Sequence, residues 1–117
     1  MRIAVPSTGK RKLSNKIAPT FSNTEHFAIV TLQDGKTDVQ VISNPGYDQG
    51  KGRGPLAART MKKLDVDLVI STEIGPGLKE ILDGYGIRYK LVESGKTIKE
   101  IIEQIEPSDY VRVGIPQ

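Results

Sequence analysis

The chain contains no cysteine and no tryptophan, and His26 is its single histidine. Without cysteine it can form no disulfide and can offer no thiolate to a metal or an iron–sulfur cluster. His26 has no cysteine or aspartate partner at helical spacing, and one histidine alone is no argument for a Ser-His-Asp site. These absences exclude thiolate metal sites and leave no residue set for a conventional hydrolase.

Long apolar runs are absent as well. The apolar runs are only a few residues long, whereas a membrane-spanning helix needs about 20. Met1 leads directly into the strand-like RIAVP, with no signal-peptide pattern. The chain of 117 residues is 37% hydrophobic and 26% charged, which is typical of one soluble globular domain. We expect a cytoplasmic protein with no membrane partner.

Carboxylates are not clustered either. Two-metal phosphoryl chemistry needs several carboxylates in one place, and the first predicted strand supplies none. Glu73 is the carboxylate best placed for a functional role, because it lies beside the crevice predicted below. An enzyme using Glu73 and a bound metal is the alternative left open. We expect no catalytic residues, no protein-ligated metal and no enzymatic activity.

Basic residues are more numerous than acidic ones, and they are unevenly spread. The net charge is +3 and the computed isoelectric point is about 9.2. One early loop contains Lys10, Arg11, Lys12 and Lys16. This loop is either an ordinary solvated surface or an anion-attracting one. We expect no nucleic-acid partner, because the predicted strands carry few exposed aromatic residues for base stacking.

The hydrophobic periodicity predicts the element order β-β-β-α-β-α-β-α. Asp34-Gly35 is a hairpin signal, and Thr97 with Glu100 forms a capping box. Strands are expected at Arg2–Pro6, His26–Leu32, Thr37–Ser43, Asp67–Thr72 and Ile87–Val92, with helices beginning near Pro55, Ile74–Gly77 and Thr97 and the last helix stopped by Pro107.

This order predicts an α/β fold with a mixed five-stranded sheet. Strand–helix–strand connections imply parallel pairing with helices on both faces, and the hairpin implies one antiparallel strand. The domain is expected to span residues 1–106. The tail, residues 107–117, contains YVRVGI (Tyr110–Ile115), which could add an edge strand or pair with a second copy in a homodimer.

The glycine-rich stretches point to a binding site. In open α/β sheets ligands lie beyond the carboxyl ends of the parallel strands, and helix N-termini favour anions there. Glycine lets a ligand approach the backbone, and Arg53 adds a charge. The alternative is ordinary turn chemistry, because the spacing matches neither the Walker A nor the dinucleotide pattern. The predicted ligand-binding residues are Thr8, Gly52, Arg53, Gly54, Pro55, Glu73, Gly75 and Pro76.

Three ordered motifs carry a family resemblance. They are Gly52-Arg53-Gly54-Pro55 before the first helix, Ile74-Gly75-Pro76 after a strand, and Gly95-Lys96-Thr97 before the last helix. With them, nearly the whole chain resembles the dinitrogenase iron–molybdenum cofactor biosynthesis domain, whose members bind or carry nitrogenase cluster precursors. The resemblance implies a ribonuclease H-like three-layer fold.

One departure from the family pattern bears on function. Many members have His-Phe-Gly-Arg before the second strand, where this chain has Thr20-Phe21-Ser22-Asn23. The resemblance therefore implies a non-catalytic carrier that docks an anionic iron–sulfur or iron–molybdenum cluster, or a small anionic metabolite, without thiolate ligation. Any metal ligands would come from a partner protein. The alternative function is a regulatory or interaction module that binds protein or nucleic acid through the basic loop.

Overall fold

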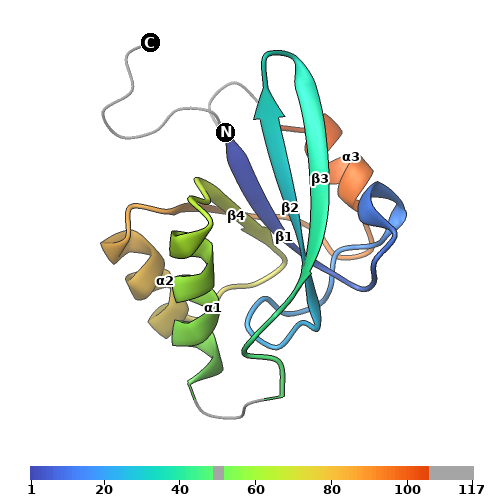
Figure 1. Ribbon diagram of the computed structural model, residues 1–117. Helices are drawn as coiled ribbons and strands as arrows, with labels where there is room; N and C mark the ends of the chain where they lie inside the picture. Colours follow the sequence, from blue (N-terminus) through green and yellow to red (C-terminus); the bar gives the residue numbers. More distant parts are fainter. Residues whose placement is uncertain (49–51, 106–117) are drawn as a thin grey trace.

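A mixed five-stranded sheet forms the centre of the computed structural model, which describes residues 1–48 and 52–105 (Figure 1). The strand order is β3-β2-β1-β4-β5. β1 pairs in parallel with β4 and β4 with β5, while β2 runs antiparallel to both β1 and β3. In chain order the elements are β1 (Arg2–Ser7), the 3-10 helix η1 (Lys12–Ser14), β2 (His26–Gln33), β3 (Lys36–Ser43), α1 (Arg53–Lys63), β4 (Leu68–Ser71), α2 (Pro76–Gly84), β5 (Arg88–Leu91) and α3 (Ile98–Glu103).

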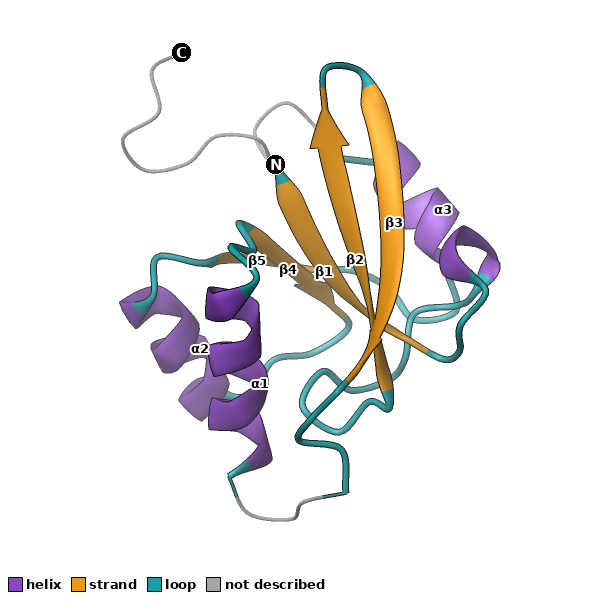
Figure 2. Cartoon of the chain, in the orientation of Figure 1, coloured by secondary structure: helices purple, strands orange, loops and turns teal. Residues whose placement is uncertain are grey.

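Helices cover both faces of the sheet. α1 and α2 pack on one face, and α3 with η1 lies on the other (Figure 2). Alternate residues of β2 serve the two cores: Phe27 and Ile29 belong to the cluster under α1 and α2, whereas Ala28 and Val30 belong to the cluster under α3. The prediction of an α/β protein with a mixed five-stranded sheet is confirmed.

The two strongest local signals form as predicted. Asp34 and Gly35 make the two-residue turn between β2 and β3, both with positive φ, at 52° and 75°. At the start of α3, the Thr97 hydroxyl accepts a hydrogen bond from the Glu100 amide, and the Glu100 carboxylate accepts one from the Thr97 amide. Both signals act within a few residues of chain, so the sequence alone predicts them.

Two element boundaries near the predicted site differ from the expectation, both at a proline. β1 continues through Pro6 to Ser7, because the Pro6 carbonyl faces Ala18 and accepts its amide at 2.8 Å. The nitrogen of Pro6 points the same way, so its missing N–H costs no bond to β2. α1 begins at Arg53 rather than at Pro55. Pro55 is tolerated because amides of the first helical turn have no intrahelical partner.

The predictions for the C-terminal part stay predictions. Pro107 and the segment Tyr110–Ile115 fall outside the described residues, as does the boundary between a domain of residues 1–106 and a tail of residues 107–117. Within the described part, α3 ends at Glu103.

Candidate functional site

A hollow of about 380 Å³ opens where the starts of α1 and α2 meet the segment that leads into β2. It lies at the edge of the sheet where β1 and β4 end, on the face covered by α1 and α2. Its described lining residues come from three chain segments far apart in sequence and are Thr20, Phe21, Ser22, Asn23, Arg53, Gly54, Glu73, Ile74, Gly75 and Leu78.

Buried hydrogen bonds hold the Thr20–Asn23 wall in place. The Asn44 side chain is buried, and its amide group donates to the carbonyl oxygens of Ser22 at 3.1 Å and Thr24 at 2.8 Å. Its carbonyl oxygen accepts the Gly46 amide at 2.9 Å. Asn44 thus ties the exit of β3 to the wall of the hollow.

Further contacts fix the wall against the other two segments. The Thr72 hydroxyl donates to the carbonyl of Pro19 at 2.8 Å, which joins the wall to the loop after β4. A Cβ on Gly46 would lie only 3.2 Å from the carbonyl oxygen of Arg53. The glycine therefore lets the chain after β3 pass close beside the start of α1. Phe21 is buried, and its ring lies 4.8 Å from that of Phe27.

Both helices that open on the hollow begin without a side-chain cap among the described residues. The N-cap residues are Gly52 for α1, with φ of 85°, and Gly75 for α2. A first helical turn leaves its amides without intrahelical partners, and its end of the helix dipole is positive. The two helix starts therefore offer hydrogen-bond donors to an anion.

Among the described residues, Arg53 is the one cation that lines the hollow. Within the described part of the chain, its guanidinium makes no hydrogen bond and no ion pair, and the residue is half-buried. Glu73 is the one carboxylate among the described lining residues, and it is exposed. Because Arg53 is not neutralised by a described neighbour, its charge is available to a bound anion.

The structure brings together four of the eight residues predicted from the sequence. Arg53, Gly54, Glu73 and Gly75 line the hollow. Three more residues adjoin it without lining it: Gly52 caps α1, Pro55 is in its first turn, and Pro76 is the first residue of α2. Their role in binding stays a prediction.

Thr8 lies away from the hollow. It is exposed, and both its amide and its hydroxyl bond the carbonyl oxygen of Lys16 at 3.1 Å. The reason is that β1 leads into the loop around η1, on the opposite face of the sheet, before the chain returns to the hollow at Thr20.

Thr20, Ser22, Asn23 and Asn44 were not among the predicted site residues. The sequence does contain a signal for the first three, because they stand where the family pattern has His-Phe-Gly-Arg. Asn44 precedes Pro45 in a polar loop, and its burial depends on contacts with residues about 20 positions away. No local pattern indicates that.

Metal-ligating groups do not gather in the described residues. No group of three or more His, Asp or Glu side chains is placed there to hold a metal ion, and the chain has no cysteine. His26 begins β2 and is 8% exposed, and its buried Nδ1 has no hydrogen-bond partner among the described residues. Within residues 1–48 and 52–105, no helix has the length and apolar character needed to cross a membrane.

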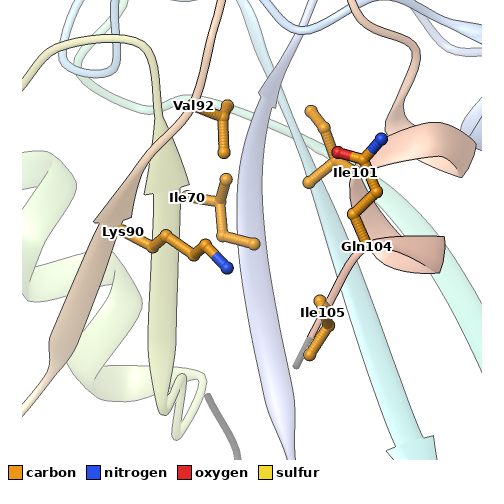
Figure 3. A pocket seen from close by; sticks show the side chains of 6 residues that line it. All are labelled: Ile70, Lys90, Val92, Ile101, Gln104 and Ile105. Carbon is orange, nitrogen blue, oxygen red and sulfur yellow. The ribbon is translucent and has the colours of Figure 1, made fainter. Parts of the chain in front are cut away.

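A second groove lies on the other face, between the sheet and α3 (Figure 3). Its floor is apolar, and Lys90 and Gln104 reach over it from β5 and from the residue after α3. Ile105 also lines this groove, and the chain continues from it into residues 106–117, outside the described part.

Comparison with known proteins assigns the chain to a family. The model of the dinitrogenase iron-molybdenum cofactor family matches residues 1–108. The chain belongs to this family. The match includes the Gly52–Pro55 and Ile74–Pro76 motifs at the hollow, as the resemblance implied. No curated protein matches the chain.

Solved structures share the fold over most of the chain. The apo form of the orange protein from Desulfovibrio gigas is 23% identical with a TM-score of 0.78, over 88% of this chain and 84% of that one. The protein PH0822 is 23% identical with a TM-score of 0.73, over 88% and 87%. A NifB-like protein of the DUF35 family from Thermotoga is 29% identical with a TM-score of 0.70, over 87% and 84%.

Proposed function

We propose that this member of the dinitrogenase iron-molybdenum cofactor family is a non-catalytic binding protein. Its cargo is an anionic metal cluster or a small anionic metabolite, held in the hollow between the starts of α1 and α2. The observation that carries the proposal is that two helices without side-chain caps begin at one hollow, beside a guanidinium without a described partner. Family membership supports the cluster as cargo.

The binding mode is electrostatic docking. Each helix N-terminus stabilises an anion by about 0.3–1 kcal/mol, and a hydrogen bond from a charged donor adds about 1.5–3 kcal/mol. The hydroxyls of Thr20 and Ser22 and the amide of Asn23 supply further donors along the wall. Because the chain has no cysteine, thiolate bonds to a cluster metal would come from the protein that delivers or receives it.

A non-catalytic role fits the lining of the hollow. General acid–base or nucleophilic chemistry needs a base beside a second reacting group. Among the described lining residues, Glu73 is the one titratable acid or base apart from Arg53, and His26 is not one of them. The same proposal includes a fold of the ribonuclease H-like class, which the strand order with β2 antiparallel to its neighbours supports.

The proposal is tested by native mass spectrometry and metal analysis of protein purified without oxygen, followed by titration of apo protein with molybdate. We expect a bound mass containing iron, molybdenum or sulfur, or a measurable affinity for molybdate. Substituting Arg53→Glu should weaken molybdate binding about 10- to 100-fold, because it removes a charged donor and adds repulsion. Arg59→Glu is the matched control, since Arg59 is exposed on the same helix and does not line the hollow.

Three results would count against the proposal. A clean apo mass together with no molybdate, sulfate or phosphate binding would remove the hollow as an anion site. Equal loss of molybdate affinity in Arg53→Glu and Arg59→Glu would show that the effect comes from net charge and not from the hollow. A turnover reaction lost in Glu73→Gln would instead favour the enzymatic alternative.

A further inference from the structure

The face opposite the hollow carries a cationic surface, defined here as Lys10, Arg11, Lys12, Lys16 and Lys96. The first four side chains are exposed on the loop around η1, and Lys96 is half-buried just before α3. Lys96 is about 80 positions from the others, so the sequence does not indicate that it belongs with them. The tertiary structure brings them together.

Backbone hydrogen bonds fasten the η1 loop to the start of α3. Lys16 and Thr97 form an antiparallel bridge. The Ile17 amide donates to the Lys96 carbonyl at 2.9 Å, and the Ile98 amide donates to the Asn15 carbonyl at 2.9 Å. The two basic segments are thus held side by side by the main chain, whatever their side chains do.

The η1 loop is tightly built although its own residues bury little apolar surface. Arg11 donates its amide to the Asn15 side chain, and the Asn15 amide donates to the Lys12 carbonyl. A Cβ on Gly9 would lie 2.9 Å from the Asn15 side-chain nitrogen, so the Asn15 side chain would have to shift if Gly9 were replaced. Lys12 has a φ of 62°, which costs a lysine about 1–2 kcal/mol. A fixed, strained loop that displays cations is typical of a recognition surface.

A carboxylate beside the cations, that of Glu100, favours a protein partner over a nucleic acid. Glu100 lies close enough to Lys96 and Lys16 for both to lower its pKa, after the larger effect of its hydrogen bonds to Thr97. An anionic backbone of closely spaced phosphates would meet this carboxylate with repulsion, whereas a protein surface can place a donor opposite it. The cationic surface also contains no aromatic ring on which a base could stack.

We propose that the cationic surface docks an acidic face of a partner protein. The inference goes beyond cargo binding and does not depend on what the hollow holds. Only Ile17–Pro19 separate Lys16 from Thr20, the first residue of the wall of the hollow. A partner seated on the cationic surface would therefore sit at the same edge of the sheet as the hollow.

The test uses NMR amide spectra of the full chain and two probes of matched negative charge. One probe is a short peptide of alternating glutamate and serine, and the other is an oligothymidylate. We expect the peptide to shift amide signals of residues 10–17 and 96–100, to bind no more weakly than the oligothymidylate, and to lose affinity as salt is raised. Tighter binding of the oligothymidylate would overturn the proposal in favour of a nucleic acid.

Matched double variants distinguish peptide binding at the cationic surface from a general effect of net charge. Lys10→Glu with Lys16→Glu should weaken peptide binding about tenfold. The control, Lys36→Glu with Lys63→Glu, changes the charge equally at exposed positions at the start of β3 and at the end of α1, and should retain affinity within about twofold. Equal weakening in both pairs, or no peptide binding to the parent chain, would overturn the proposal.

A neutral pair and the Arg53→Glu variant complete the design. Lys10→Gln with Lys16→Gln avoids new repulsion with Glu100, so it stays interpretable if the glutamate pair unfolds, and it should weaken peptide binding about threefold. Arg53→Glu should leave peptide binding unchanged while reducing molybdate binding. Failure of the cationic surface and failure of the hollow are therefore distinguishable.

Discussion

The helix starts on the two faces of the sheet differ in whether a side chain caps their first amides. At α3, Thr97 and Glu100 close a capping box with their own side chains. At α1 and α2 the N-cap positions are glycines, and no described side chain caps either helix. A cap stabilises a helix start by about 1 kcal/mol, so an empty cap forgoes stability. The chain lacks this stabilisation at α1 and α2, which begin at the hollow, and has it at α3 on the opposite face of the sheet.

The α3 cap and the hollow also differ in how far apart in the sequence their stabilising contacts lie. The α3 cap is local, since its partners are three residues apart. The hollow depends on long-range bonds, because Asn44 and Thr72 reach across 20 or more positions to hold its wall. The α3 cap should therefore be weakened only by changes to Thr97 and Glu100. The hollow should also be altered by changes to residues outside its lining.

The largest expected effect is from removing the Asn44 side chain. Asn44→Ala leaves the Ser22 and Thr24 carbonyls and the Gly46 amide without their partners. We expect the free energy of unfolding to fall by about 2–3 kcal/mol and molybdate affinity to fall with it, measured by urea denaturation and titration. Asn23→Ala, the same change at an exposed position of the wall, should cost less than about 0.5 kcal/mol. Similar losses in both variants would contradict the role assigned to Asn44.

Removing the α3 cap should have a smaller effect. Thr97→Ala eliminates both bonds of its hydroxyl with Glu100, and we expect a loss of about 1 kcal/mol in urea denaturation with molybdate affinity unchanged. Thr60→Ala is the control, because the Thr60 hydroxyl bonds the Leu56 carbonyl inside α1 and alanine is a better helix former. A loss of molybdate binding in Thr97→Ala would show that the two faces are coupled.

Adding a cap at the hollow should move stability and binding in opposite directions. A Cβ at Gly75 meets no atom within 4 Å, and its φ of −68° suits any residue. We expect Gly75→Asp to raise the free energy of unfolding by a few tenths of a kcal/mol and to weaken molybdate binding about three- to tenfold, because its carboxylate occupies the α2 donors. Gly75→Ala leaves the cap empty and should keep its affinity. Unchanged affinity in Gly75→Asp would exclude the α2 start from the site.

The smallest effect is the pH dependence of the α3 cap. Hydrogen bonds from Thr97 hold the pKa of Glu100 below its ordinary value of 4.5. A lowered pKa in the folded state stabilises the fold above the unfolded value, and this contribution is lost as pH falls through the folded pKa. Denaturation of Glu100→Gln across acidic pH should show less pH dependence than the parent chain, and identical profiles would contradict the assignment.

The sequence predicts most of the secondary structure because its signals are local. The Asp34-Gly35 turn, the capping box of Thr97 and Pro76 at the start of α2 each act within a few residues. The misplaced boundaries at Pro6 and Pro55 have one cause: a proline breaks an element only where its N–H would have been used. At Pro6 that is decided by Ala18, which is distant in the sequence.

The candidate site is predictable only in part. Its helix starts are visible as glycine–proline motifs, and four of the eight residues predicted from the sequence line the hollow. The opposite wall, Thr20–Asn23, is visible only as a departure from a family pattern. Thr8 fails to reach the hollow because the chain leaves β1 toward the η1 face, a direction that residues 6–9 do not specify.

By itself the sequence determined the elements, the open helix starts and the absence of thiolate ligands, since these depend on residue identity and short-range backbone preference. The tertiary structure decided which of these features meet. Sheet order placed the wall before β2 beside α1 and α2, and packing on the other face placed Lys16 beside Thr97. The physical reason is that a contact between distant residues depends on how both segments pack on the common sheet, which neither segment encodes alone.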